Sequence, residues 1–253
     1  MVSRRAVIGS GLSLAALGAA GYSLWPDMST YHEEIARQRQ LLTSDPTLEE
    51  LVRVATLAAN GHNAQPWLFR LEPQQISILP DVLRRTSVVD PDDHHLFVSL
   101  GCAAENLILA AGAHGQSADV NISNGASTQI SIALSPGNAA ESALYKAIPF
   151  RQSTRSVYDS QPLTAEELAL LKQAAEEEGV TTLFFTDPSD LEDILELVVA
   201  GNSAQMDDPA FVTELRDWIR FDSTRAVESG DGLFAACSGN PVMPEWLGRA
   251  IFD

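Results

Sequence analysis

Apolar and polar residues alternate along the chain in patterns that predict both strands and helices. Alternation bounded by turn residues predicts four strands, at residues 67–71, 75–79, 118–122 and 129–134. Residues 94–114 are almost all apolar, which predicts a long helix buried on every face. Shorter helices are expected at residues 141–148, 190–200 and 209–221. This order is a coarse mixture of helices and strands.

Two segments share the pattern Thr-x-Glu-Glu-Leu, at residues 47–51 and 164–168. Each has the form of a capping box, in which the threonine caps a helix and the glutamate bonds back to it. About twenty residues after each threonine comes a strand-like run, at residues 67–71 and 182–185. The two openings indicate a weak internal duplication.

The N-terminal segment differs in composition from the rest. Arg4 and Arg5 are followed by an uncharged stretch from Ala6 to Trp25. As a helix it would span roughly 30 Å, the thickness of a bilayer's hydrocarbon core. The Ser-Arg-Arg start resembles a twin-arginine export signal. Residues 1–26 are therefore predicted to be an export signal or a membrane anchor, and the sequence does not decide whether the segment is cleaved. Either case places the protein in the periplasm or on the outer face of the cytoplasmic membrane.

Composition narrows the class of protein. A chain of 253 residues can bury a full core, as one large domain or two small ones. The net charge of −18 argues against nucleic-acid binding. Cys102 and Cys237 are the only cysteines, and we expect no disulfide between them. His94 and His95 are adjacent and have no cysteine or histidine cluster nearby, so no metal site is predicted.

Two short segments carry candidate binding chemistry. Residues 60–67 read Asn-Gly-His-Asn-Ala-Gln-Pro-Trp, and residues 151–155 read Arg-Gln-Ser-Thr-Arg. Carboxamides can bond the edge of a flat polar heterocycle, and fixed guanidinium charges can hold its phosphate, which makes a flavin site a reasonable hypothesis. The plainer alternative for Arg151 and Arg155 is a surface or helix-start pair of cations. Trp67 is expected in the core.

Three motifs together resemble the nitroreductase-like flavoproteins. Residues 58–67 are similar to the family's Asn and Gln-Pro-Trp loop, and residues 101–111 to its central interface helix. Residues 151–158 are similar to its Arg-x-Ser-x-Arg-x-aromatic stretch. Their order resembles the tandem-repeat (Acg-like) branch, in which one chain forms a pseudo-dimer around one FMN.

The resemblance covers about residues 45–250. It implies an α+β, nitroreductase-like fold, with a central mixed or antiparallel sheet flanked by helices, and a domain organisation. Residues 27–148 would be the first half and residues 149–253 the second. The second half is expected to be incomplete, because no second copy of the 101–111 helix precedes Asp253. The protein would be a monomeric pseudo-dimer or a homo-oligomer.

The resemblance also implies a cofactor site. Arg151 and Arg155 would hold the FMN phosphate and the N1–O2 edge of the ring, and Ser153 the phosphate or ribityl oxygens. In the loop, Asn63 and Gln65 would bond the ring or ribityl chain. The backbone at Asn60 and Gly61 would approach the ring closely.

The function implied is that of an FMN-dependent oxidoreductase. It would reduce nitroaromatic, quinone or similar small acceptors by ping-pong hydride transfer, with NAD(P)H as a possible donor. No protein residue is expected to be catalytic, because the chemistry occurs at flavin N5. Two alternatives stay open: a flavin-binding or storage protein without turnover, and a cofactor-free relic.

Overall fold

The computed structural model describes residues 26–123, 128–153, 155 and 157–252. The predicted export signal or anchor falls on residues 1–25, outside the described residues, so it stays a prediction. Of the described residues, those within Met1–Thr154 and Glu214–Asp253 form one compact unit, and Arg155–Thr213 forms another. The division into halves at residue 148 also stays a prediction.

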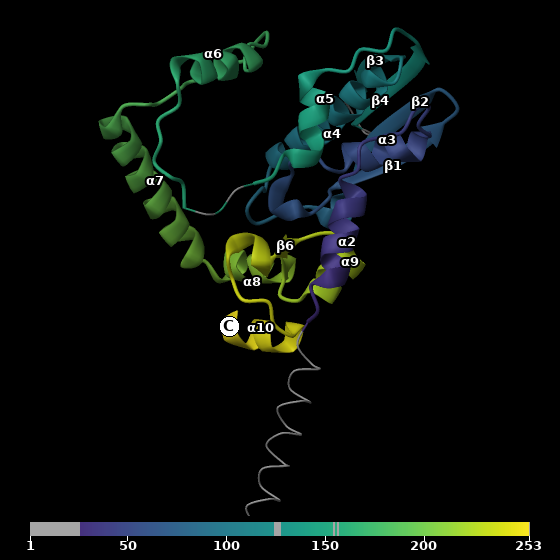
Figure 1. Ribbon diagram of the computed structural model, residues 1–253. Coiled ribbons are helices and arrows are strands. Elements are labelled where there is room, and N and C mark those ends of the chain that lie inside the picture. The colour runs from purple at the N-terminus through teal and green to yellow at the C-terminus, as the bar shows by residue number, and fades with distance from the viewer. Residues whose placement is uncertain (1–25, 124–127, 154, 156, 253) are drawn as a thin grey trace, which may run out of the picture. The chain divides into compact units, whose positions relative to one another are not determined.

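A four-stranded antiparallel sheet forms the centre of the first unit (Figure 1). Its strands are β1 (Trp67–Glu72), β2 (Gln75–Pro80), β3 (Gln116–Ser123) and β4 (Gln129–Pro136). Their spatial order is β1-β2-β4-β3, so two hairpins meet where β2 pairs with β4. All four strands were predicted from alternation, and Trp67 lies in the core as expected. The structure confirms an α+β arrangement with an antiparallel sheet.

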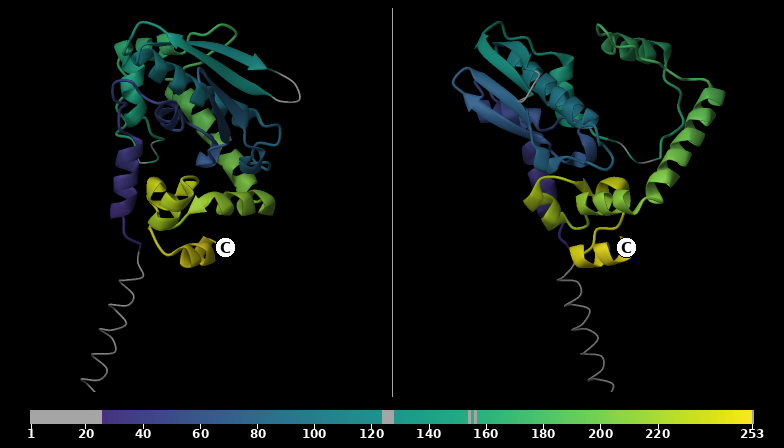
Figure 2. Two further views of the ribbon diagram at one scale, coloured as in Figure 1. Left: turned by 90° about the vertical axis from the view of Figure 1, so that its right-hand side faces the viewer. Right: turned by 180° about the vertical axis from the view of Figure 1, so that it is seen from behind.

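Helices cover one face of this sheet. The long helix α4 (His94–Ala113) contacts β2, β3 and β4, and α3 (Leu48–Ala55) packs on α4 (Figure 2). Isoleucines of β2 and β4 and leucines of the helices make the fully buried centre: Leu51, Ile76, Ile78, Leu100, Leu107 and Ile132. The half-buried Asn106 donates its side-chain amide to the carbonyl of Val54, 3.3 Å away, and so joins the two helices.

The prediction that α4 is buried on every face was wrong. Phe97, Val98, Gly101 and Glu105 are exposed along one side, because the sheet and the neighbouring helices surround only part of α4. Among the described residues, α4 meets the length and composition criteria for a helix that could cross a membrane. Its packing on the sheet identifies it as a core helix of the first unit.

Both predicted capping boxes are present. In α3, Thr47 Oγ1 accepts from the Glu50 amide at 3.3 Å, and the Glu50 carboxylate accepts from the Thr47 amide at 2.9 Å. In α6 (Ala165–Ala174), Thr164 and Glu167 make the same pair of bonds. The strand predicted after the second box was wrong. Residues 182–185 are not in a strand, and no described strand pairs with them.

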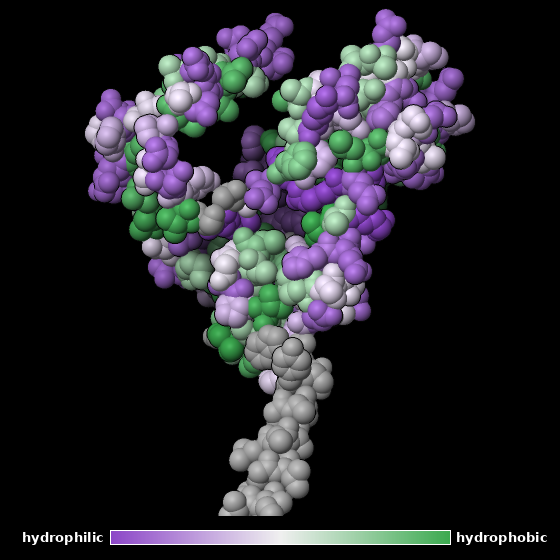
Figure 3. Space-filling model, in the orientation of Figure 1, coloured by the Kyte–Doolittle hydropathy of each residue, from purple (hydrophilic) through white to green (hydrophobic). Residues whose placement is uncertain are grey.

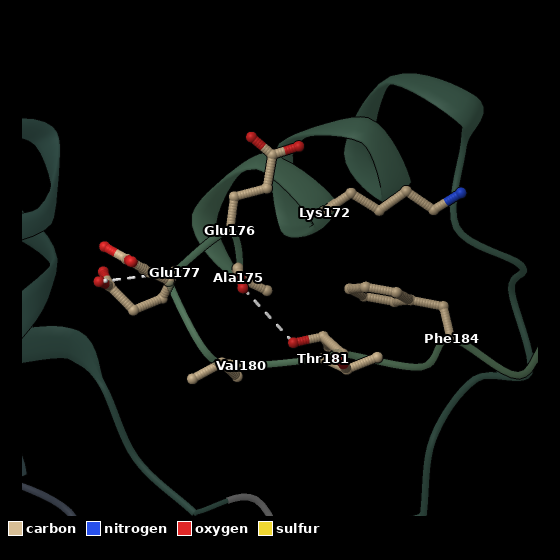
Figure 4. Close-up of a pocket in the computed structure, with 9 residues that line it drawn as sticks. Lys172, Ala175, Glu176, Glu177, Val180, Thr181 and Phe184 are labelled. Carbon is tan, nitrogen blue, oxygen red and sulfur yellow. Dashed lines mark hydrogen bonds between the residues drawn. The ribbon is translucent and has the colours of Figure 1, made fainter.

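The second unit consists mainly of α6 and α7 (Pro188–Met206), neither of which buries a residue. The helix predicted at 190–200 is therefore confirmed and longer than expected. Lys172, Ala175, Thr181 and Phe184 line an open hollow beside the end of α6 (Figure 4). Hydrophobic and hydrophilic residues are interspersed over the face of the protein drawn in Figure 3.

The remaining elements of the first unit are short. Before the sheet come α2 (Ser29–Gln38) and η1 (Gly61–Asn63), and η2 (Val82–Arg84) follows β2. The helix expected at 141–148 is α5 (Ala143–Ala147), continued by η3 (Ile148–Phe150), so Pro149 ends the α-helix but stays inside a helical turn.

The C-terminal segment returns to the N-terminal part of this unit. It begins within α8 (Pro209–Trp218), which belongs to the second unit up to Thr213. It continues with β5 (Ile219–Arg220), α9 (Ser223–Ser229), β6 (Leu233–Phe234), η4 (Ala235–Ser238) and α10 (Glu245–Phe252). The Ser223 hydroxyl donates to the Asp27 carbonyl at 2.6 Å, and the rings of Tyr31 and Phe234 lie 4.4 Å apart. Burial and the bond to Cys237 raise the pKa of Tyr31 above its ordinary value.

Candidate functional site

The loop at residues 60–65, called the site loop below, has an unusual backbone. His62, Asn63 and Gln65 have positive φ angles of 50°, 51° and 54°. They are three of the six described non-glycine residues with positive φ. Such conformations cost of order 1–3 kcal/mol each and persist where the surroundings impose them. Strained backbone therefore concentrates in the loop that the sequence picked out.

The carboxamides of this loop hold its shape. The Asn60 side-chain oxygen accepts from the Gln65 amide at 2.9 Å, closing the turn. The Gln65 side chain donates to Asn63 Oδ1 at 3.0 Å and to the Thr56 carbonyl at 3.3 Å. The bonds to the Gln65 amide and to the Thr56 carbonyl are partly buried, so they satisfy polar groups that the turn shields from water and offset part of the strain.

The backbone at Gly61 is open on one side. A Cβ atom added there would meet no heavy atom within 4 Å. Gly61 is half-buried at the start of η1, so its main chain is reachable without a side chain in the way. A flat ligand could approach the loop at this point.

Arg151 lies against the same region. Its guanidinium donates to the carbonyl of Leu57 at 3.0 Å, three residues before Asn60. Its own carbonyl accepts from the guanidinium of Arg39 at 3.0 Å, and the Pro149 carbonyl accepts from the same nitrogen at 2.7 Å. The structure therefore brings together Arg151 and the segment leading into the site loop, which the sequence had placed about ninety residues apart.

Among the described residues, no acid forms an ion pair with either of these two arginines. Both Arg39 and Arg151 donate to backbone carbonyls instead. Burial, and then the charge of Arg39, lower the pKa of Arg151, while Cys102 raises it. A guanidinium remains protonated at any physiological pH. Two neighbouring cations without an acidic partner suit an anionic group such as a phosphate.

Two other predicted site residues, Ser153 and Arg155, are exposed. Ser153 is exposed two residues after Arg151 in the first unit. Arg155 is exposed and belongs to the second unit, so its pairing with Arg151 around one ligand stays a prediction.

Sequence reasoning missed two contributors. Arg39 directly follows α2 and belongs to no recognised motif. Its position as a basic residue at a helix end was the only sequence signal for it. The turn at residues 230–232, called the C-terminal turn below, was read only as a loop. Its Gly232 accepts from the Asn63 side-chain amide at 3.0 Å and donates its own amide to the Asn63 carbonyl at 2.8 Å.

Comparison with known proteins found similar sequences but no matching family model. The chain is 29% identical over 197 residues to proteins named "Putative NAD(P)H nitroreductase" in two strains of Mycobacterium tuberculosis. The aligned part is 73% of this chain and 56% of each relative, so the chain spans about half the length of the curated relatives it matches. Over this part the chain is similar to proteins named as nitroreductases, and its antiparallel sheet flanked by helices is compatible with a nitroreductase-like fold.

Proposed function

We propose that this protein is an FMN-dependent oxidoreductase that takes reducing equivalents from NAD(P)H and passes them to a small acceptor such as a nitroaromatic or a quinone. The relatives' names support a nitroreductase-type reaction with that donor. The observation that carries the proposal is the 3.0 Å hydrogen bond from Arg151 to Leu57, which joins the basic segment to the segment that opens the site loop.

The chain offers distinct groups for each part of the cofactor. Arg151 and Arg39 would hold the phosphate, and Ser153 would donate to a phosphate or ribityl oxygen. The open backbone at Gly61 would lie along the ring, with Gln65 at its polar edge. Bound FMN would supply the hydride chemistry, so the chain's own residues bind, orient and shield rather than act as nucleophile or acid.

Two further parts of the proposal go with it. Arg155 would be a further phosphate ligand, as the resemblance to a pseudo-dimeric family implies. The N-terminal segment would export or anchor the protein after the cofactor is bound, which is the use of twin-arginine signals.

The first test is the colour of the purified protein. We expect a yellow protein with flavin absorbance, and Arg151→Ala should release the flavin. Arg225→Ala is the matched control, because Arg225 is an exposed arginine on α9. A wild-type protein that stays colourless after incubation with FMN would overturn the proposal, and an Arg151→Ala variant that keeps full colour would overturn the site.

The second test separates turnover from storage. Under anaerobic conditions NAD(P)H should bleach the flavin, and addition of a quinone should restore its absorbance. A yellow protein that NAD(P)H leaves unbleached would replace the oxidoreductase by a flavin-storing protein.

A further inference from the structure

The C-terminal turn has glycines with positive φ at both ends, and at Gly232 no other residue fits. Gly230 ends α9 with a φ of 62°, and Gly232 has a φ of 83°. A Cβ on Gly232 would lie 2.5 Å from the Trp218 carbonyl oxygen and 2.8 Å from the Arg220 guanidinium carbon. Both the backbone conformation and the lack of space exclude a larger residue here. The turn is therefore pressed closely against β5.

Asp231, between these glycines, ties two arginines together. Its carboxylate accepts from Arg220 at 2.6 Å through one oxygen and from Arg84 at 2.6 Å through the other. The Arg220 and Asp231 side chains are 7% and 10% exposed, so this ion pair is shielded from water. Removing one partner of such a pair leaves the other charge buried and unpaired, which is strongly destabilising.

Three hydrogen bonds connect this arrangement to the site loop. Asn63 exchanges two with Gly232, through its backbone carbonyl and its side-chain amide. Arg84 donates the third, to the Ala64 carbonyl at 3.1 Å, from the nitrogen that also bonds Asp231. All three reach Asn63 or Ala64, in the stretch where the backbone has positive φ. The strain there requires outside contacts to hold it, and these bonds supply them.

We propose that the C-terminal turn is a clamp on the site loop, in which Asp231 and Asn63 are positioning residues rather than ligands of the cofactor. Asp231 fixes Arg84, and Arg84 and Gly232 fix the peptide groups of Asn63 and Ala64. The clamp itself follows from contacts within the chain; only its effect on flavin binding rests on the proposed function.

Hydrogen exchange of the cofactor-free protein tests the clamp directly. In Asp231→Asn, the backbone amides of residues 62–65 should exchange roughly tenfold faster, because a hydrogen bond to a charged group is lost. Asp217→Asn is the matched control: its carboxylate is 61% exposed and 3.6 Å from Arg249. Equal exchange of the loop in Asp231→Asn and wild type, with circular dichroism unchanged, would overturn the clamp.

Asn63→Asp provides a second variant should Asp231→Asn fail to fold. It keeps the size and the tolerance of positive φ, but replaces the donor to Gly232 by an oxygen. Its loop amides should also exchange faster. Unchanged exchange in this variant would count equally against the proposal.

Flavin affinity then separates positioning from direct binding. If Asn63 acts through the clamp, Asn63→Asp and Asp231→Asn each weaken FMN binding. The double variant then loses little more affinity than the single variant with the larger loss. Multiplied losses would mean that Asn63 touches the ligand itself. Should wild type bind no FMN, the proposed function fails, while the exchange experiment still decides the clamp.

Discussion

The guanidinium of Arg151 donates a hydrogen bond to the carbonyl of Leu57, 94 residues earlier in the chain. Leu57 lies just after α3, and the site loop begins three residues later. One bond thus joins a cation to the segment that leads into a loop with strained backbone and an open glycine. A second cation, Arg39, is held in the same place through the carbonyls of Pro149 and Arg151.

Arg39 should therefore contribute to anion binding although no motif contains it. Arg39→Ala should weaken FMN binding by about tenfold or more, since a charge-assisted hydrogen bond contributes about 1.5–3 kcal/mol. Arg39→Lys should keep part of the affinity. Fluorescence titration measures both, with Arg70→Ala, on β1, as the control. An Arg39→Ala protein that binds FMN as wild type does would exclude Arg39 from the site.

The C-terminal turn should make the first unit sensitive to acid. Burial alone would raise the pKa of Asp231, but bonds from Arg220, Ser229 and Arg84 outweigh it and hold the pKa below its ordinary value of 3.8. A depressed carboxyl pKa adds stability above the unfolded-state pKa, and that stability is lost as the pH falls through the folded-state pKa.

The measurement is urea unfolding of wild type and Asp231→Asn at several pH values. The difference in unfolding free energy should be constant near neutral pH and should shrink as the pH falls below 3.8. A difference that stays the same through this range would show that the charge of Asp231 does not stabilise the fold.

Local patterns in the sequence predicted the local structure well. The strands were read from alternation and the helix starts of α3 and α6 from Thr-x-Glu-Glu-Leu, because both signals act within a few residues. The strand predicted at residues 182–185 was wrong because β-propensity favours extended chain but cannot supply a partner strand. The exposed side of α4 was missed for a similar reason: apolar composition does not say how many neighbours a helix has.

Only part of the candidate site could be predicted from the sequence. The carboxamides and Arg151 stood out by residue type. Asn63 and Gly232 are separated by 169 residues, and a Gly-Asp-Gly turn carries no sign of where it docks. Arg39 was missed likewise, because its closeness to Arg151 comes from folding and not from spacing.

The two capping boxes should differ in their effect on stability although their sequences match. Thr47→Ala should lower the free energy of unfolding of the first unit by about 1 kcal/mol, because α3 carries core residues such as Leu51. Thr164→Ala should leave that transition unchanged, since α6 belongs to the other unit and buries nothing. Tryptophan fluorescence during urea unfolding suits this comparison, as residues 155–213 contain no tryptophan. Equal losses in the two variants would contradict the division into units.

Truncating leucines at matched helix positions should separate core from surface. Leu107 on α4 is fully buried among the isoleucines of the sheet, whereas Leu197 on α7 is 74% exposed. Leu107→Ala should cost about 2–5 kcal/mol through lost burial and the cavity left behind. Leu197→Ala should stay within about 0.5 kcal/mol. The same urea titration measures Leu107→Ala, and far-ultraviolet circular dichroism follows Leu197→Ala. A small loss in Leu107→Ala would mean that α4 does not form the core of the first unit, and a large loss in Leu197→Ala would mean that its side chain is covered in solution.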